Sequence, residues 1–138
     1  MTAITRFCSL VLGIVLSCAG HAADPAISPH ALQALMAAPD RPLIVDVRTP
    51  PEYSAGHVPG AINIAYDRID DLWPARHVPS DREVVLYCGT GRRAGIAQRS
   101  LEALGYTHTR LLDGSFKAWT AAHLPVADSV SGGDKPGN

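Results

Sequence analysis

Charge of either sign is scarce in this sequence. Twelve basic and thirteen acidic residues give a formal net charge of -1, and Lys and Arg form no stripe along the chain. Neutralising nucleic-acid phosphates requires clustered basic residues, so nucleic acid is excluded as the main partner. Apolar residues make up 46% of the 138 residues and charged residues 18%. This balance is typical of one folded globular domain rather than a disordered chain.

The chain also lacks a hydrophobic run long enough to span a membrane. Counted generously, the apolar stretch at residues 7–19 has 13 residues, whereas a spanning helix needs about 20. It follows Arg6 and precedes the small residues Gly20 and Ala22, the pattern of a secretory signal peptide. The first 22 residues are therefore predicted to be cleaved, leaving a periplasmic protein without a membrane anchor. An uncleaved anchor, a buried helix and a lipoprotein acylated at Cys18 remain alternatives.

Cysteine is also scarce in this sequence. Cleavage after residue 22 would remove Cys8 and Cys18 and leave Cys88 as the only thiol. That excludes an internal disulfide, and it disfavours a Cys-x-x-Cys oxidoreductase site because no resolving cysteine follows. A lone cysteine in an exported protein instead indicates an intermolecular bond or a reactive thiol. The six histidines show no close pair at metal-ligand spacing, so neither a metal nor a cofactor is expected.

Predicted strands and helices alternate between residues 26 and 126. The strands are short apolar runs at 43–47, 61–64, 83–87 and 109–112, and helices are predicted from Pro29, over 67–73, over 94–104 and over 115–123, with a helical turn from Pro50 to Gly56. Strands separated by helix-length segments need crossover connections. The predicted fold class is therefore α/β, with a mainly parallel sheet and helices on both faces. Residues 127–138 are rich in Gly, Ser and Asp and are predicted to be a disordered tail.

The segment most informative about function joins the third predicted strand to the longest predicted helix. Ligands of open α/β sheets bind at the carboxyl ends of the strands, which is where Cys88 lies. Gly89 and Gly91 allow the backbone to curl with its N–H groups inward. The helix start near residue 93 or 94 adds unpaired N–H donors, and Arg92 and Arg93 add positive charge. The segment predicts an anion-binding loop with a sulfur atom at its base.

Two consequences follow for Cys88. Helix N-termini and nearby cations lower a cysteine pKa from about 8.5 to a range of roughly 3.5 to 7.5, which favours the thiolate. The same donors, including the backbone of Gly89, Thr90 and Gly91, would hold a persulfide anion on this residue. Sulfur transfer needs both a nucleophilic thiolate and a cradle for the carried sulfur. The alternative is a small buried hydrophobe beside solvated arginines, but the unbroken succession of strand, Cys, two Gly, two Arg and helix favours a reactive thiol.

This loop resembles the active-site loop of the rhodanese family, and two other segments extend the resemblance. Residues 46–53 and 56–64 are similar to the family's N-terminal motif, and residues 112–119 to its C-terminal motif. Together the motifs cover about residues 26–126. The chain is most similar to small exported single-domain rhodaneses of the phage-shock-protein type.

The resemblance implies a five-stranded, mainly parallel sheet and an enzyme, a thiosulfate sulfurtransferase. Sulfane sulfur would pass from thiosulfate or a similar donor, through a Cys88 persulfide, to a thiophilic acceptor such as cyanide or a thiol. Arg92 matches a position that steers thiosulfate, while Arg93 either assists or turns outward. The partners are then small molecules, and any protein thiol partner stays unidentified. Ser115 replaces the second glycine usual after Asp-Gly, which puts that turn in question.

Other functions and other residues stay open beside this interpretation. Cysteine-based phosphatases and arsenate reductases use a similar loop, but with Arg six residues after Cys, where this chain has Ala94. A non-catalytic persulfide carrier is a further alternative. Asp46 and Arg48 are expected to pair and hold the fold, because both project from one side of a buried strand. His57 is expected to bond backbone groups in its Gly-rich bend rather than act as a base.

Overall fold

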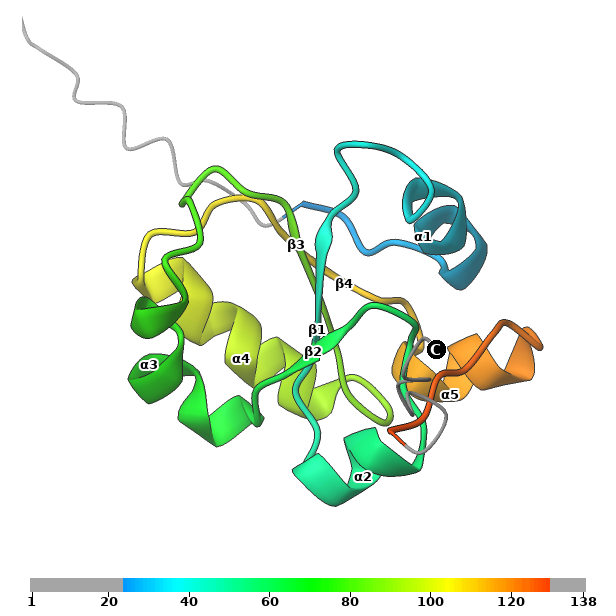
Figure 1. Ribbon diagram of the computed structural model, residues 1–138. Coiled ribbons are helices and arrows are strands. Elements are labelled where there is room, and N and C mark those ends of the chain that lie inside the picture. The colour runs from blue at the N-terminus through cyan, green and yellow to red at the C-terminus, as the bar shows by residue number, and fades with distance from the viewer. Residues whose placement is uncertain (1–23, 130–138) are drawn as a thin grey trace, which may run out of the picture.

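The computed structural model describes residues 24–129, which form a parallel sheet between two layers of helices (Figure 1). Within this range the sheet has four strands in the order β2-β1-β3-β4. They are β1 (Leu43–Asp46), β2 (Ile62–Asn63), β3 (Val84–Tyr87) and β4 (Thr109–Leu111), and all neighbours are parallel. The α/β fold class predicted from the sequence is confirmed. The predicted signal peptide lies outside the described residues, as does the part of the predicted tail after residue 129.

The fifth strand implied by the family resemblance is wrong for this chain, because the sheet described here has four. Ile27 makes only a single parallel bridge to Leu112, with its N–H donating to the Leu111 carbonyl at 2.9 Å. Pro25 on one side has no N–H to extend the ladder. On the other side Ser28 turns the chain into a helix, so the pairing stops after one residue.

Residues 24–129 contain five α-helices. They are α1 (Pro29–Leu35), α2 (Pro50–Ala55), α3 (Ile69–Leu72), α4 (Arg92–Ala103) and α5 (Ser115–Ala121). Helices α2, α3 and α4 connect strands, while α1 precedes β1 and α5 follows β4. Ser28 caps α1 as its sequence position suggests, with its hydroxyl accepting from Ala31 N at 3.2 Å. The single helix predicted over 67–73 is instead divided into η1 (Tyr66–Arg68) and α3, and a further 3-10 turn, η2 (Pro74–Arg76), follows it. Pro74 starts the last of these 3-10 turns, a position where its missing N–H leaves no bond unmade.

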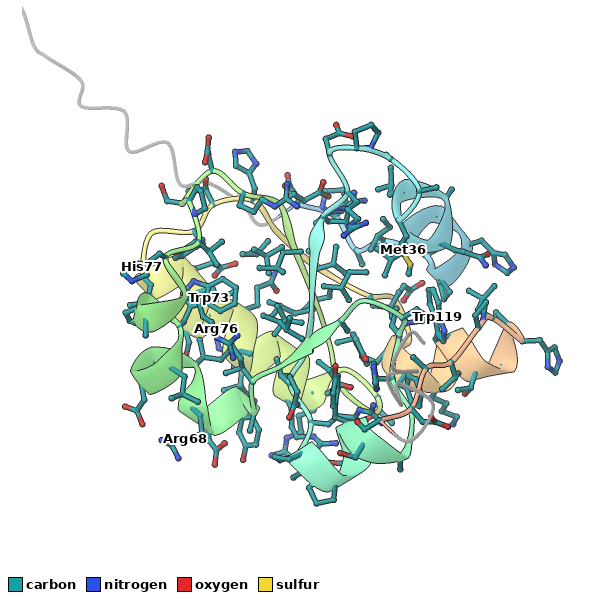
Figure 2. The ribbon with its side chains drawn as sticks, viewed as in Figure 1. Met36, Arg68, Trp73, Arg76, His77 and Trp119 are labelled. Carbon is teal, nitrogen blue, oxygen red and sulfur yellow. The ribbon has the colours of Figure 1, made fainter. Side chains whose placement is uncertain are left out.

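The core has two parts, one on each face of the sheet. Figure 2 shows Trp73 beside α3 and α4 and Trp119 in α5 on the opposite face, and both indole rings are almost fully buried. Alternate strand residues supply the two parts: Val45, Val84 and Leu86 face Trp73, whereas Ile44, Val85 and Tyr87 face Trp119. A strand covered on both faces needs apolar side chains at every position, which is why these runs do not alternate with polar residues.

The parallel register brings the carboxyl ends of two central strands to one edge of the sheet. Asp46 at the end of β1 pairs with Tyr87 at the end of β3. The chain continues from these positions into the loop before α2 and the loop before α4, and Figure 1 shows α2 at this end of the molecule. The Cys88 segment therefore lies beside α2. No helix among residues 24–129 is long and apolar enough to cross a membrane.

The chain still bonds to the domain just after residue 126, the predicted end of the domain. Ala127 pairs with His57 in both directions, with N–O distances of 2.8 and 2.9 Å. Ser129 N also donates to the Ser54 carbonyl at 3.3 Å. Ala127 and Ser129, both assigned to a disordered tail, are thus bonded to α2 and the residues that follow it.

Candidate active site

The sulfur atom of Cys88 lies against the backbone of the loop that follows it. Gly91 N donates to Sγ at 3.0 Å. Gly91 has a φ of 115°, which an L-residue rarely adopts, and it is the N-cap residue of α4. Helix α4 begins at Arg92, slightly earlier than predicted. The first N–H groups of a helix have no partner within it, so they are available to an anion at this position.

These backbone donors change the acidity of the thiol. Burial raises the pKa of Cys88, but the backbone N–H groups of Ala94, Gly91, Thr90 and Arg93 lower it, and the net pKa lies below that of a free thiol. Hydrogen bonds to the charged form of an acid favour that form. The loop geometry therefore favours a thiolate at Cys88.

Cys88 is at the same time a buried residue. Only 1% of its surface is exposed, and it packs in the part of the core that contains Trp73 and Ala97. A buried cysteine in purely apolar surroundings has a raised pKa and is unreactive. Here one side of the sulfur meets apolar side chains and the other meets amides, so burial keeps bulk water away without removing the stabilisation of negative charge.

Arg93 is held beside this loop by a carboxylate from α2. Its guanidinium donates two hydrogen bonds to Glu52, Nη1 to Oε2 at 2.8 Å and Nη2 to Oε1 at 2.9 Å. Glu52 also caps α2 by accepting from the N–H and hydroxyl of Thr49. The bond from Arg93 is the main reason that the pKa of Glu52 is lowered, and the same bond raises the pKa of Arg93. Arg93 therefore does not turn outward, one of its two expected orientations.

Arg92 is placed differently from its neighbour. Its side chain is exposed at the start of α4. Among the residues that the structure describes, no hydrogen bond or ion pair engages it. Its charge is available to an arriving anion, whereas the charge of Arg93 is already matched by Glu52. Thr90 is also exposed, and Gly89 lies close to Arg93, since a Cβ at Gly89 would be 3.5 Å from Nη2.

The first turn of α5 holds the loop from the other side. Ser115 Oγ accepts from Cys88 N at 3.3 Å, and Phe116 N donates to the Cys88 carbonyl at 3.0 Å. Lys117 N donates to the Gly89 carbonyl at 3.1 Å. The turn that Ser115 put in question is formed, with this residue at a φ of 54°. Sequence reasoning identified neither Ser115 nor Glu52 as part of the site. The only signal for Glu52 was its capping position after Thr49.

Asp46 and Arg48 form a buried ion pair, as expected from their spacing. Arg48 Nη2 lies 2.6 Å from Asp46 Oδ2, and Nε lies 2.9 Å from Oδ1. Nη2 also donates to the Gly56 carbonyl at 2.7 Å, at the end of α2. The guanidinium stacks over Phe116, 4.1 Å from the ring centroid. The pair therefore joins β1 to α2 and α5.

His57 bonds a backbone group, as predicted from its Gly-rich bend. Nδ1 lies 2.9 Å from the Tyr53 carbonyl oxygen, and the imidazole stacks on the Tyr53 ring with centroids 3.8 Å apart. Its backbone pairs with Ala127. The ring is thus occupied by α2 rather than directed to Cys88.

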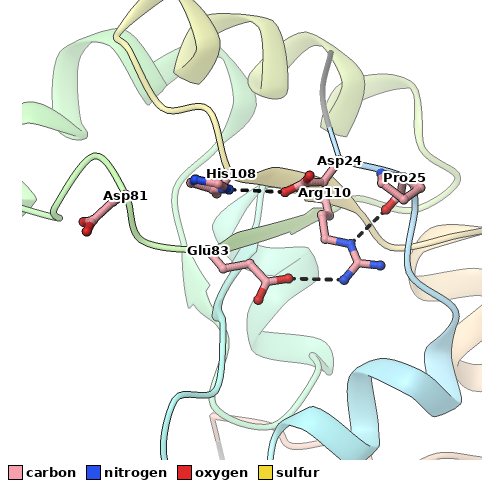
Figure 3. A pocket seen from close by; sticks show the side chains of 6 residues that line it. All are labelled: Asp24, Pro25, Asp81, Glu83, His108 and Arg110. Carbon is pink, nitrogen blue, oxygen red and sulfur yellow. Dashed lines mark hydrogen bonds and ion pairs between the residues drawn. The ribbon is translucent and has the colours of Figure 1, made fainter. Parts of the chain in front are cut away.

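A hollow of about 420 Å³ lies elsewhere, around the starts of β3 and β4 (Figure 3). Its charged side chains other than Asp81 bond within the hollow itself. Arg110 donates to Glu83 at 3.3 Å and to the Pro25 carbonyl at 2.8 Å, and His108 lies 3.6 Å from Asp24. This is the edge opposite to the one at which ligands of parallel sheets bind. We therefore assign the candidate active site to the Cys88 loop and not to this hollow.

Comparisons with known proteins agree with this geometry. The family model of the rhodanese-like domain matches residues 28–122. The thiosulfate:glutathione sulfurtransferase of Saccharomyces cerevisiae is 33% identical over 90 residues, which are 57% of this chain and 65% of that protein. The thiosulfate sulfurtransferase PspE of Escherichia coli K12 is 42% identical over 65 residues, 46% of this chain and 62% of that protein. The chain thus spans less than two thirds of either relative.

A solved structure matches over more of the chain. The human single-domain sulfurtransferase has a TM-score of 0.64 and 29% sequence identity, and the match covers 71% of this chain and 96% of that one. The similarity therefore extends over most of this chain and nearly all of the human one.

Proposed function

Because the chain belongs to the rhodanese-like domain family, we propose that it is a thiosulfate sulfurtransferase that carries sulfur as a persulfide on Cys88. The observation that carries this proposal is the position of Sγ, 3.0 Å from Gly91 N among the first amides of α4. Those amides lower the pKa of the thiol. They would favour a terminal persulfide sulfur for the same reason, since it too is an anion.

The reaction has two balanced steps. In the first, the Cys88 thiolate attacks the sulfane sulfur of thiosulfate and a new S–S bond forms. The bond to the sulfonate group breaks, and sulfite leaves with the electron pair. In the second, a thiolate or cyanide attacks the outer sulfur, the Cys88 S–S bond breaks, and the thiolate is regenerated. No proton transfer is needed at either step once the nucleophile is ionised, which agrees with His57 being occupied by Tyr53.

We assign recognition of the donor to Arg92. Thiosulfate carries two negative charges, and the free guanidinium of Arg92 at the start of α4 is an available cation beside the loop. Arg93 has the different task of keeping positive charge next to Cys88 while bound to Glu52. The names of the yeast and bacterial relatives support thiosulfate as donor, and that of the yeast protein supports a small thiol as acceptor.

Turnover measurements test the function directly. The protein should form thiocyanate from thiosulfate and cyanide, and sulfite from thiosulfate and glutathione, with both activities absent in Cys88→Ser. Hydrolysis of an aryl phosphate without either sulfur reaction would instead favour a phosphatase. A protein that accepts sulfur once but does not turn over would be a persulfide carrier.

Export to the periplasm is proposed from the N-terminal sequence alone. The pattern of Arg6, a short apolar stretch and small residues before residue 23 supports it. Expression of the full-length chain in a bacterium, followed by cell fractionation and intact mass, should give a periplasmic protein that begins at Ala23. Recovery of the uncleaved chain from the cytoplasm would contradict this proposal.

A further inference from the structure

The hydroxyl of Ser115 bonds the Cys88 backbone, a contact that neither the family resemblance nor the sequence of the loop predicts. Ser115 is 1% exposed, and its Oγ accepts from the backbone N–H of Cys88 at 3.3 Å. A Cβ at Gly91 would lie 3.9 Å from the same oxygen. The hydroxyl is therefore packed against the base of the loop, between the residue that carries the sulfur and the residue whose amide contacts it.

The sheet explains why Cys88 needs this partner. Val84 N donates to His108 O and Leu112 N donates to Leu86 O, so the next acceptor along the ladder for Cys88 N would be the Leu112 carbonyl. That carbonyl instead accepts Ser115 N at 2.9 Å, where the chain turns into α5. Without the hydroxyl, the buried N–H of Cys88 would lose the acceptor that the structure gives it.

The backbone of Ser115 supports a functional reason for the side chain. Its φ of 54° lies in the left-handed region, which glycine adopts without strain and other residues disfavour. The preceding Gly114 is also left-handed, with a φ of 65°. A second glycine would thus adopt this turn with less backbone strain. Serine adds strain but supplies a hydroxyl that glycine lacks. Strained residues of this kind are concentrated at functional sites.

We propose that Ser115 is a positioning residue whose hydroxyl fixes the Cys88 peptide so that Sγ stays among the amides at the start of α4. Phe116 N donates to the carbonyl of Cys88 at 3.0 Å, so the first turn of α5 bonds both the N–H and the C=O of Cys88. The assignment rests on the proposed role of Cys88 as sulfur carrier. It adds that the position of the Cys88 sulfur is determined by α5 as well as by the loop that follows Cys88.

Two substitutions separate the hydroxyl from the backbone strain. Ser115→Gly removes the hydroxyl and relieves the left-handed conformation, whereas Ser115→Ala removes the hydroxyl and keeps the strain. Thr120→Ala is the matched control, since its hydroxyl bonds only α5 carbonyls, those of Phe116 and Lys117. The readouts are the pH midpoint of Cys88 alkylation by iodoacetamide, the melting temperature, and kcat and KM for thiosulfate.

Both Ser115 variants should shift the alkylation midpoint upward by about half a pH unit or more, because the amides no longer meet Sγ in one fixed geometry. Their kcat should fall about tenfold with KM little changed, because Arg92 is untouched. Ser115→Gly should melt above Ser115→Ala, and Thr120→Ala should titrate like the wild type. An unshifted midpoint in Ser115→Gly would overturn the proposal, and so would a shift found only in Ser115→Ala. Absence of sulfur transfer by the wild type would refute the function of Cys88 but leave the alkylation shift measurable.

Discussion

At the scale of single residues, Cys88 experiences two opposing effects. Burial beside Trp73 and Ala97 disfavours a charge on its sulfur, and the amides of residues 90, 91, 93 and 94 favour one. The amides prevail and the pKa is lowered. A buried thiolate is suited to sulfur transfer. Water and bulky reagents are kept away from the sulfur, whereas small anions can reach it.

The first prediction concerns the pH dependence of this thiol. Because its pKa is lowered from that of an ordinary cysteine, the thiolate fraction should rise with pH through a midpoint below that of a free cysteine. Above the midpoint the rate should be level. The measurement is the rate of Cys88 alkylation by iodoacetamide as a function of pH, read by mass spectrometry. A midpoint at or above that of a free cysteine would contradict the amide stabilisation.

The second prediction separates the two arginines. Arg92→Ala should raise KM for thiosulfate about tenfold with kcat nearly unchanged, since a free cation that steers an anion contributes to binding. Arg93→Ala should lower kcat and raise the alkylation midpoint, because it removes a cation that interacts with Cys88 and leaves the Glu52 carboxylate unpaired. Steady-state kinetics of both variants provide the check. A normal KM in Arg92→Ala combined with a raised KM in Arg93→Ala would reverse the assignment.

At the scale of secondary-structure elements, contacts between segments distant in sequence position the loop. Helix α2 supplies Glu52 to Arg93, 41 residues away, and α5 supplies Ser115 to Cys88, 27 residues away. Neither pair has a local pattern, so the sequence could not reveal them. The loop itself was predictable, because its Cys, glycines and arginines are consecutive and lie between a strand and a helix.

The third prediction tests the ion pair that joins these elements. Asp46→Asn should destabilise the protein by about 3–5 kcal/mol, because it leaves the buried guanidinium of Arg48 without its counter-charge. Both side chains are nearly inaccessible to water, at 0% and 6% exposure. Asp40→Asn, at an exposed position, should change the free energy of unfolding by less than about 0.5 kcal/mol. Equal effects of the two substitutions on urea-induced unfolding would show that the Asp46 pair is not structural.

At the scale of the whole molecule, the short apolar runs predicted the layer architecture correctly. Both faces of β1 and β3 are covered by helices, so their residues are apolar at nearly every position and are easily recognised. The errors arose where the secondary structure of a segment depends on the residues next to it rather than on its own apolar pattern. The fifth strand implied by the resemblance is reduced to the Ile27–Leu112 bridge by Pro25 and Ser28, and the helix predicted over 67–73 is divided between Arg68 and Ile69 into η1 and α3. Pairings between segments distant in the sequence were the least predictable part.

The central claim is that the Cys88 sulfur holds a second sulfur atom within the loop. Incubation of the protein with thiosulfate, followed by removal of the small molecules and intact mass measurement, tests it most directly. The wild type should gain the mass of one sulfur atom and lose it on addition of cyanide, while Cys88→Ser should gain nothing. An unchanged wild-type mass, or an equal gain in both proteins, would contradict the account.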